Sequence, residues 1–204
     1  MFKNPAVNEE YRRVSAAPMQ GIGTAHPLVD LDDAILAYFA LADYFTDPEN
    51  GEVEEMLVGV RSIDLLASAL LRQTVAFGGV RKYEAPLDVA ATAFFGMVKN
   101  HPFADGNKRT ALLLLLYQLG LYGYRPVASG EDFEALVVAV AAGALASAYP
   151  TAWEDGAAGD REVAALARIL APMVTPAAPT EAGLGTILAI TRAFAAPLRR
   201  LKDE

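Results

Sequence analysis

The sequence of 204 residues contains no cysteine. Disulfide bonds and thiolate zinc sites are therefore excluded, and the composition fits a reducing compartment. The amino terminus also lacks the apolar run of a signal peptide, because charged side chains such as Lys3, Glu9 and Arg12 interrupt it. We therefore expect a cytoplasmic protein.

Positive charge is scarce, since 17 Lys and Arg residues face 25 Asp and Glu residues and the formal net charge is −8. A nucleic-acid surface needs clustered Lys and Arg, so we expect no nucleic-acid partner and only local binding of any phosphate. Long apolar runs are missing too. The segments 111–124 and 135–149 fall short of the ~18–20 apolar residues that a membrane span requires, so both are expected to be buried helices.

Alternating runs of Val, Ile and Thr are also absent, which favours helices. We predict an all-α protein with an arm at 1–29, loose or docked, a core at 30–126, and a helical extension at 127–204 packed on that core. Acids at positions 30, 32 and 33 indicate the start of a helix. The predicted helical segments are 31–45, 53–77 (one helix or a pair), 87–99, a helix from within 101–111 to 119 with Gly120 as its stop, 131–148, 161–170 and 184–201.

Residues 101–111 read His-Pro-Phe-Ala-Asp-Gly-Asn-Lys-Arg-Thr-Ala and carry most of the functional signal. An imidazole titrates near neutral pH and can take a proton from a hydroxyl, so His101 is a candidate general base. Asp105 offers the hard oxygen that Mg²⁺ prefers beside phosphates. Gly106 and Asn107 form a tight turn into a helix, where free N–H groups create an anion site.

Lys108 and Arg109 follow in the first helical turn, although cations are favoured at the opposite end of a helix. A bound polyphosphate would explain them, with a forked contact from Arg109 and a point charge from Lys108. Each residue alone has an ordinary explanation: His101 as a loop histidine, Asp105 as part of a common turn, Phe103 as a core anchor. Their conjunction within nine residues favours a functional site.

Residues 101–109 resemble the signature of the Fic/Doc family, His-x-Phe-x-(Asp/Glu/Asn)-(Gly/Ala)-Asn-(Gly/Lys)-Arg. The resemblance covers about residues 30–125 and is closest to the Doc (death-on-curing) branch. It implies a Fic/Doc-type helical bundle with a short flap hairpin or loop at 79–84. It also implies ATP as co-substrate with Mg²⁺, and transfer of a nucleotide-derived group to a protein hydroxyl.

The resemblance assigns a role to each signature residue. His101 would be the general base, Asp105 the Mg²⁺ ligand, Gly106, Asn107 and Lys108 the anion hole, and Arg109 a direct phosphate ligand.

Two positions differ from the Fic members that transfer AMP. Those members usually have Gly where Lys108 stands and a second Arg where this chain has Leu112. In Doc-type proteins the lysine accompanies a reversed nucleotide, with the γ-phosphoryl group facing the hydroxyl. The resemblance thus implies a Doc-like toxin kinase acting on a translation factor such as elongation factor Tu, controlled by a separate antitoxin. AMP transfer and a catalytically silent nucleotide-binding module remain alternatives.

Autoinhibited Fic proteins carry Ser/Thr-x-x-x-Glu-(Gly/Asn), whose Glu pairs with the second signature Arg. The nearest segment here is 151–156, with Asp155 in the acid position and Leu112 in place of the arginine. We therefore expect no in-chain inhibition of that kind. The extension at 127–204 is expected to add bundle helices or an oligomer interface, with target or antitoxin binding as the alternative.

Overall fold

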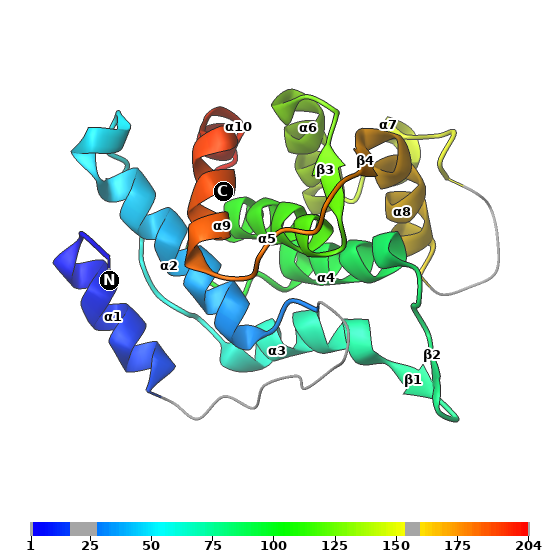
Figure 1. Ribbon diagram of the computed structural model, residues 1–204, viewed down its shortest axis with the longest axis horizontal. Helices are drawn as coiled ribbons and strands as arrows, with labels where there is room; N and C mark the ends of the chain where they lie inside the picture. The colour runs from blue at the N-terminus through cyan, green and yellow to red at the C-terminus, as the bar shows by residue number, and fades with distance from the viewer. Residues whose placement is uncertain (1, 17–27, 154–159, 204) are drawn as a thin grey trace.

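The computed structural model describes residues 2–16, 28–153 and 160–203, and in these ranges the chain is predominantly helical (Figure 1). The prediction of an all-α fold is confirmed. The helices are α1 (Pro5–Ser15), α2 (Leu31–Thr46), η1 (Pro48–Asn50), α3 (Ile63–Leu71), η2 (Arg72–Thr74), α4 (Pro86–Asn100), α5 (Asn107–Leu121), α6 (Gly130–Ala141), α7 (Leu145–Ala148), α8 (Arg161–Met173), α9 (Leu184–Ala193) and α10 (Ala195–Arg200), and the strands are β1 (Ala76–Phe77), β2 (Val80–Arg81), β3 (Tyr124–Pro126) and β4 (Val174–Pro176).

Helix α5 lies at the centre of the bundle, against α2, α4, α6 and α9 (Figure 1). Residues 109–120 are all buried, as expected for a helix that is apolar on nearly every face. The prediction of a buried core helix here is confirmed. Neither α5 nor any other helix in the described part of the chain combines the length and apolarity that a membrane crossing needs.

Helix α2 begins at Leu31, as the acids at positions 30, 32 and 33 predicted. Asp30 and Asp33 form a reciprocal capping box, which satisfies two N–H groups at the helix start. Asp33 also accepts a hydrogen bond from the Tyr117 hydroxyl of α5 at 3.0 Å. Burial raises the pKa of Asp33, and it raises the pKa of Tyr117 to about 12. This polar contact fixes α2 against the central helix.

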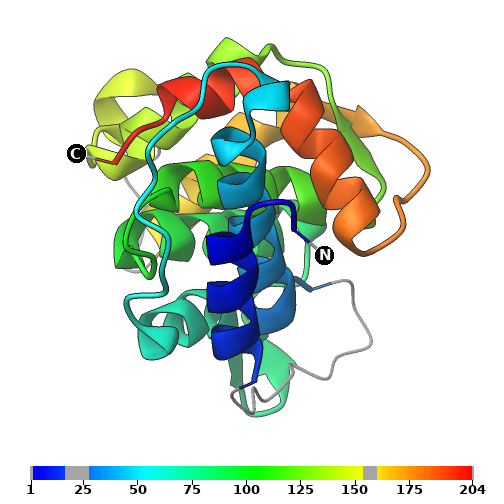
Figure 2. The same cartoon turned by 90° about the vertical axis from the view of Figure 1, so that its left-hand side faces the viewer.

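The amino-terminal arm contains a helix that the sequence analysis did not anticipate. Asn4 caps α1 through its side-chain oxygen, and α1 lies alongside α2 (Figure 2). Phe2 and Tyr11 pack edge to face at 5.1 Å between ring centroids, and Tyr11 packs on Phe39 of α2 at 5.5 Å. This part of the arm is docked; residues 17–27 lie outside the described ranges.

The prediction of helix over residues 53–77 was wrong for most of that range. Residues 53–62 are non-helical, and α3 begins only after Ser62, whose hydroxyl caps the amide of Leu65. The backbone of this segment bonds to the signature loop instead, as described below. Further on, β1 and β2 form a hairpin whose turn residues Gly78 and Gly79 have φ of 58° and 82°. Two consecutive positive φ values suit a two-residue hairpin turn, and glycine adopts them without strain.

Gly120 does not terminate α5, contrary to prediction. The helix continues to Leu121, and the first positive φ comes at Gly123, at 77°. Gly120 instead permits close packing, because a Cβ there would lie 2.8 Å from Oγ1 of Thr180. The predicted end of α5 at Gly120 was therefore close to the observed end at Leu121, but the turn glycine is Gly123, three residues later.

Two of the helices predicted within 127–204 are interrupted. Helix α6 ends in a turn at Gly143 (φ 68°), where the amide of Ala144 bonds to the carbonyl of Ala139 at 2.8 Å, and α7 follows. Phe194 separates α9 from α10. Helix α8 packs on α4, while β4 pairs antiparallel with β3. The proposed division at 29 and 126 stays a prediction.

The packing of α3 on α4 depends on Gly96, since a Cβ there would lie 2.8 Å from the carbonyl oxygen of Ala69 and 2.9 Å from its Cα. We predict that Gly96→Ala lowers the free energy of unfolding by about 1–3 kcal/mol, because backbone must shift to admit the methyl group. Urea denaturation measures the change. Gly185→Ala in α9 is the matched control: a Cβ there meets nothing within 4 Å, so a gain of up to about 1 kcal/mol is expected. Similar losses in both variants would contradict the packing argument.

Candidate active site at the start of α5

The signature occupies the loop between α4 and α5 and the first turn of α5. His101 ends α4 in the left-handed region, with φ of 47°, and Gly106 precedes α5 with φ of 77°. A left-handed conformation is unusual for a residue other than glycine and is held only where the surroundings fix it. The candidate base is therefore set at a sharp reversal of the chain.

Residues 57–62 hold this loop from one side. The carbonyl oxygen of Pro102 accepts hydrogen bonds from the amides of Arg61 and Ser62 at 2.8 and 3.1 Å. The amide of Ala104 donates to the carbonyl of Gly59 at 2.9 Å. The Arg61 guanidinium donates to the carbonyl of His101. These bonds explain why the segment is extended rather than helical.

Phe103 anchors the loop from below, as predicted, and is fully buried. Its ring stacks on that of Tyr38 with the centroids 4.0 Å apart and the planes 3° from parallel. The Tyr38 hydroxyl accepts a hydrogen bond from the amide of Gly59 at 2.8 Å. Burial raises the pKa of Tyr38 to about 12, so this phenol stays protonated at neutral pH.

Asn107 connects the loop to the helix. Its Oδ1 accepts from the amide of Phe103 at 2.8 Å, and its Nδ2 donates back to the carbonyl of Phe103 at 3.1 Å. The same Nδ2 donates to Oδ2 of Asp203 at 2.6 Å. One buried side chain thus closes the loop and presents a donor to an anion.

The amides at the start of α5 also point at an anion. The carboxylate of Asp203 accepts from the amide of Asn107 at 2.7 Å and from the amide of Lys108 at 3.3 Å. Two of the three predicted anion-hole residues, Asn107 and Lys108, therefore donate to one carboxylate, whereas the amide of Gly106 donates to Oδ1 of Asp105. Glycine is favoured at position 106 because its φ of 77° is one that other residues rarely adopt.

Arg109 is buried beside this site. Its guanidinium forms an ion pair with Glu54 at 2.6 Å, and its Nε donates to the carbonyl of Leu201 at 2.8 Å. Arg199 approaches the same carboxylate at 3.1 Å, and both guanidiniums lie 4.9 Å from the ring centroid of Phe45. The sequence analysis missed Glu54 and Arg199, which no motif indicated.

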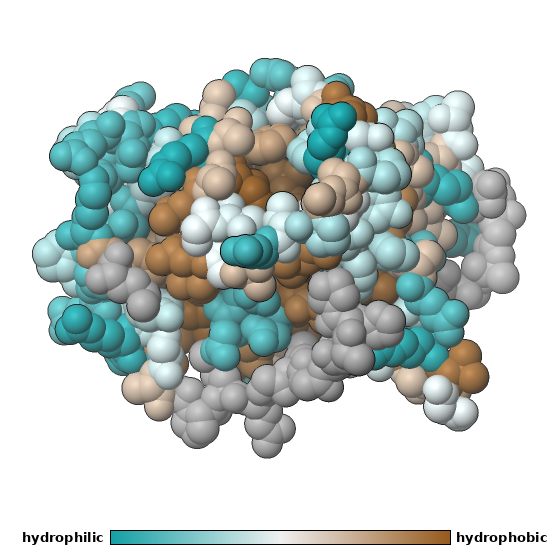
Figure 3. Space-filling model, viewed as in Figure 1, coloured by the Kyte–Doolittle hydropathy of each residue, from teal (hydrophilic) through white to brown (hydrophobic). Residues whose placement is uncertain are grey.

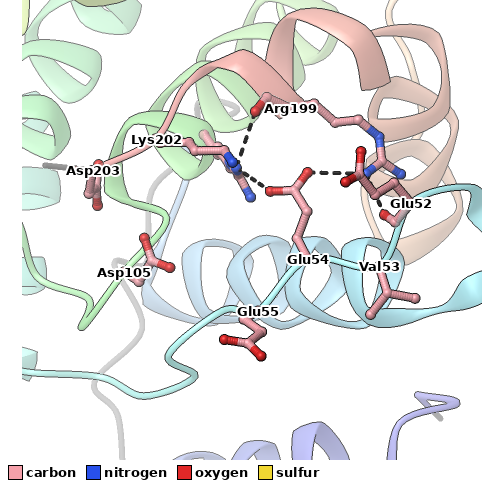
Figure 4. Close-up of a pocket in the computed structure, with 9 residues that line it drawn as sticks. Glu52, Val53, Glu54, Glu55, Asp105, Arg199, Lys202 and Asp203 are labelled. Atoms are coloured by element: carbon pink, nitrogen blue, oxygen red, sulfur yellow. Dashed lines mark hydrogen bonds and ion pairs between the residues drawn. The ribbon is translucent and has the colours of Figure 1, made fainter.

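A pocket of about 490 Å³ opens beside these groups (Figure 4). That volume is within the range of small-molecule sites. Asp105 and Arg109 contribute to it, whereas His101, Gly106, Asn107 and Lys108 lie outside its lining. The residues that line it are Glu52, Val53, Glu54, Glu55, Asp105, Arg109, Arg199, Lys202 and Asp203.

No group of three or more His, Cys, Asp or Glu side chains that could hold a metal occurs among the described residues. Asp105 nevertheless suits Mg²⁺, which proteins commonly bind through one or two carboxylates together with substrate phosphates. Its Oδ1 accepts from the amide of Gly106 at 2.6 Å, so the carboxylate is oriented at the edge of the pocket. The donor set fits an ion that arrives with a nucleotide.

The hairpin formed by β1 and β2 occupies the place where the resemblance puts a flap. Its base is tied to Asp160, at the start of α8, by the Tyr83 hydroxyl and the Lys82 ammonium. Its tip is apolar in the space-filling view (Figure 3), and Phe77 and Val80 are each more than half exposed. A loop fixed at its base with an apolar tip can lie against another chain.

Comparison with protein-family models agrees with this geometry. Residues 28–119 match the Fic/DOC family. The matched Fic/DOC region runs from just before α2 to near the end of α5 and contains the whole signature. Searches of curated proteins and of solved structures found no match. The similarity to the family is limited to this region, and α6 to α10 lie beyond it.

Within the Fic/DOC region, Glu54 neutralises a cation that has little access to water. We predict that Glu54→Ala lowers the free energy of unfolding by about 3 kcal/mol, because a buried Arg109 loses its counter-ion. Urea denaturation tests this. The control is Glu131→Ala, which removes an exposed partner of Arg200 and should change stability little. Equal losses of unfolding free energy in the two variants would show that the buried ion pair stabilises the fold no more than the exposed one.

Proposed function

We propose that this protein is a Doc-like kinase that transfers the γ-phosphoryl group of ATP to a hydroxyl of a target protein. Members of the Fic/DOC family are typically protein-modifying transferases that use nucleoside triphosphates. The observation that carries the proposal is the anion hole at the start of α5. There, the backbone amides of Asn107 and Lys108 and the side-chain amide of Asn107 donate to one carboxylate, that of Asp203.

In this proposal the signature residues bind and orient the reactants. The amides of Asn107 and Lys108, with the Arg109 side chain, hold the phosphates at the helix start. Asp105 would hold Mg²⁺, which neutralises phosphate charge when bound. His101 takes the proton of the attacking hydroxyl as its oxygen bonds to the γ-phosphorus. The bond from that phosphorus to the bridging oxygen breaks, and ADP leaves.

Two residues favour phosphoryl transfer over AMP transfer. Lys108 places a cation at the anion hole, and its Nζ already donates to a carbonyl oxygen, that of Lys202, at 2.8 Å. Leu112 takes the place of the second arginine of AMP-transferring members and is fully buried in the core. The apolar, buried side chain of Leu112 therefore offers no cation to the phosphates, which the second arginine supplies in AMP-transferring members. AMP transfer is the alternative with the same fold and a different product.

The target and the partner are part of the proposal. A translation factor such as elongation factor Tu is the target type that the resemblance supports, and a separate antitoxin would control the toxin. The exposed apolar tip of the β1–β2 hairpin is a suitable contact for a target segment. A catalytically silent nucleotide-binding module would have no chemical need for both His101 and Asp105.

We predict that His101→Ala abolishes transfer and leaves ATP binding largely intact, because the imidazole acts on the hydroxyl and not on the phosphates. Loss of a general base typically lowers the rate by about 10²–10⁴-fold. Mass spectrometry of elongation factor Tu incubated with ATP and Mg²⁺ would show the gain of one phosphate with the unmodified enzyme and no gain with the variant. Calorimetry of ATP binding is the control. If the His101→Ala variant still transferred phosphate at the rate of the unmodified enzyme, His101 would not be the general base.

The product depends on Lys108 in this scheme. We predict that Lys108→Gly weakens phosphorylation and admits AMP transfer, because the freed space lets the nucleotide bind in the opposite direction. The mass gained by the target distinguishes phosphate from AMP. Lys99→Ala is the matched control, since that ammonium donates to the carbonyl of Ala141 on α6 and should leave the product unchanged. An unchanged product in Lys108→Gly would mean that Lys108 does not orient the nucleotide.

A further inference from the structure

Residues 201–203 follow α10 and lie across the start of α5, where they fill the anion hole. Asp203 accepts the amides of Asn107 and Lys108 and the side-chain amide of Asn107, at 2.7, 3.3 and 2.6 Å. The carbonyl of Lys202 accepts from the Lys108 ammonium at 2.8 Å. The donors proposed to bind phosphate are therefore engaged by the chain itself.

A carboxylate can occupy the phosphate position because both groups present negatively charged oxygen atoms. Both groups carry negative charge on oxygen atoms that accept several hydrogen bonds, and both are favoured at a helix start. Asp203 receives three such bonds from two adjacent residues. A phosphate cannot bind the same amides while the carboxylate is present, so the two are mutually exclusive.

The segment is anchored at one end and more open at the other. Leu201 is 1% exposed, and its carbonyl accepts from Nε of Arg109. Arg199, just before it, donates to the carbonyls of Asn50 and Glu52 at 2.9 and 2.7 Å. Lys202 is exposed and Asp203 is half-buried. Residues 202 and 203 can therefore move away without unpacking the anchor.

We propose that residues 202–203 form an autoinhibitory latch in which the Asp203 carboxylate occupies the phosphate site and must leave before a polyphosphate binds. The latch rests on the proposed function in one respect: the polyphosphate that displaces Asp203 is taken to be that of ATP. It differs from the Ser/Thr-x-x-x-Glu inhibition considered above, because Asp203 bonds to amides of the anion hole and no second arginine is involved. In the nearest match to that motif, 151–156, residues 154–156 lie outside the described ranges.

The test uses the full chain and inorganic tripolyphosphate with Mg²⁺ as the probe. If the open form makes up a tenth or less of the protein, Asp203→Ala should bind the probe at least about 10-fold more tightly, because apparent affinity scales with the binding-competent fraction. Asp203→Asn, which keeps an acceptor without the charge, should fall between. Isothermal titration calorimetry gives the affinities, and thermal unfolding confirms that each variant folds.

Glu55→Ala is the matched control, because it removes an acid from the same pocket that does not bond to the anion hole. A comparable gain in this control would assign the effect to general charge repulsion and overturn the latch. Equal affinities of the unmodified protein and Asp203→Ala, including no binding to either, would overturn it too.

A second measurement follows the latch directly. Adding tripolyphosphate to the unmodified protein should increase deuterium uptake in the segment that contains residues 202–203, and unchanged uptake despite binding would contradict displacement. Tighter binding of the probe by Asp203→Ala, without phosphoryl transfer from ATP by either protein, would support the latch and refute the kinase. The two proposals can therefore fail separately.

Discussion

The first turn of α5 imposes the main electrostatic constraint on this structure. A helix start already carries partial positive charge, and here it also carries Lys108 and Arg109, so anions must be close by. Two distant segments supply them. Glu54 pairs with the Arg109 guanidinium, and Asp203 takes the free amides. Because these acids come from positions far apart in the chain, meeting this charge demand also ties residues 53–62 and the segment after α10 to the centre of the bundle.

The local parts of the site could be predicted because their signals are local. The acids before α2, the apolar run of α5 and the signature itself specify their structure within a few residues. Residues 53–62 carry no such signal. The backbone partners of residues 59–62 include Pro102 and Ala104, some 40 positions on, so a single sequence offers no indication that this part is non-helical. Tertiary hydrogen bonding decided the conformation here, and helix propensity did not.

The same reasoning explains the missed groups. Asp203 resembles any acid near a chain end until the fold brings it to Asn107, 96 residues away. Glu54 is one acid among several in its segment, and only burial beside Arg109 distinguishes it. Gly120 signalled a helix end in the sequence, but its role is to admit Thr180. The signature indicated Asn107 and Lys108 as donors to an anion, whereas nothing in the sequence indicated that Asp203 would accept from them.

The helices beyond the Fic/DOC region bear on regulation as well as on packing. These helices cover the core with buried apolar side chains, among them Leu198 of α10. Helix α10 goes further, because it packs on α5, α6 and α9 and directs the following residues onto the α5 start. In the proposed latch a polyphosphate would replace the Asp203 carboxylate at the amides of Asn107 and Lys108, so these amides have an anionic acceptor in both states. The latch proposed for residues 202–203 therefore depends on helices outside the matched region, because α10 positions the carboxylate that the α5 amides bind.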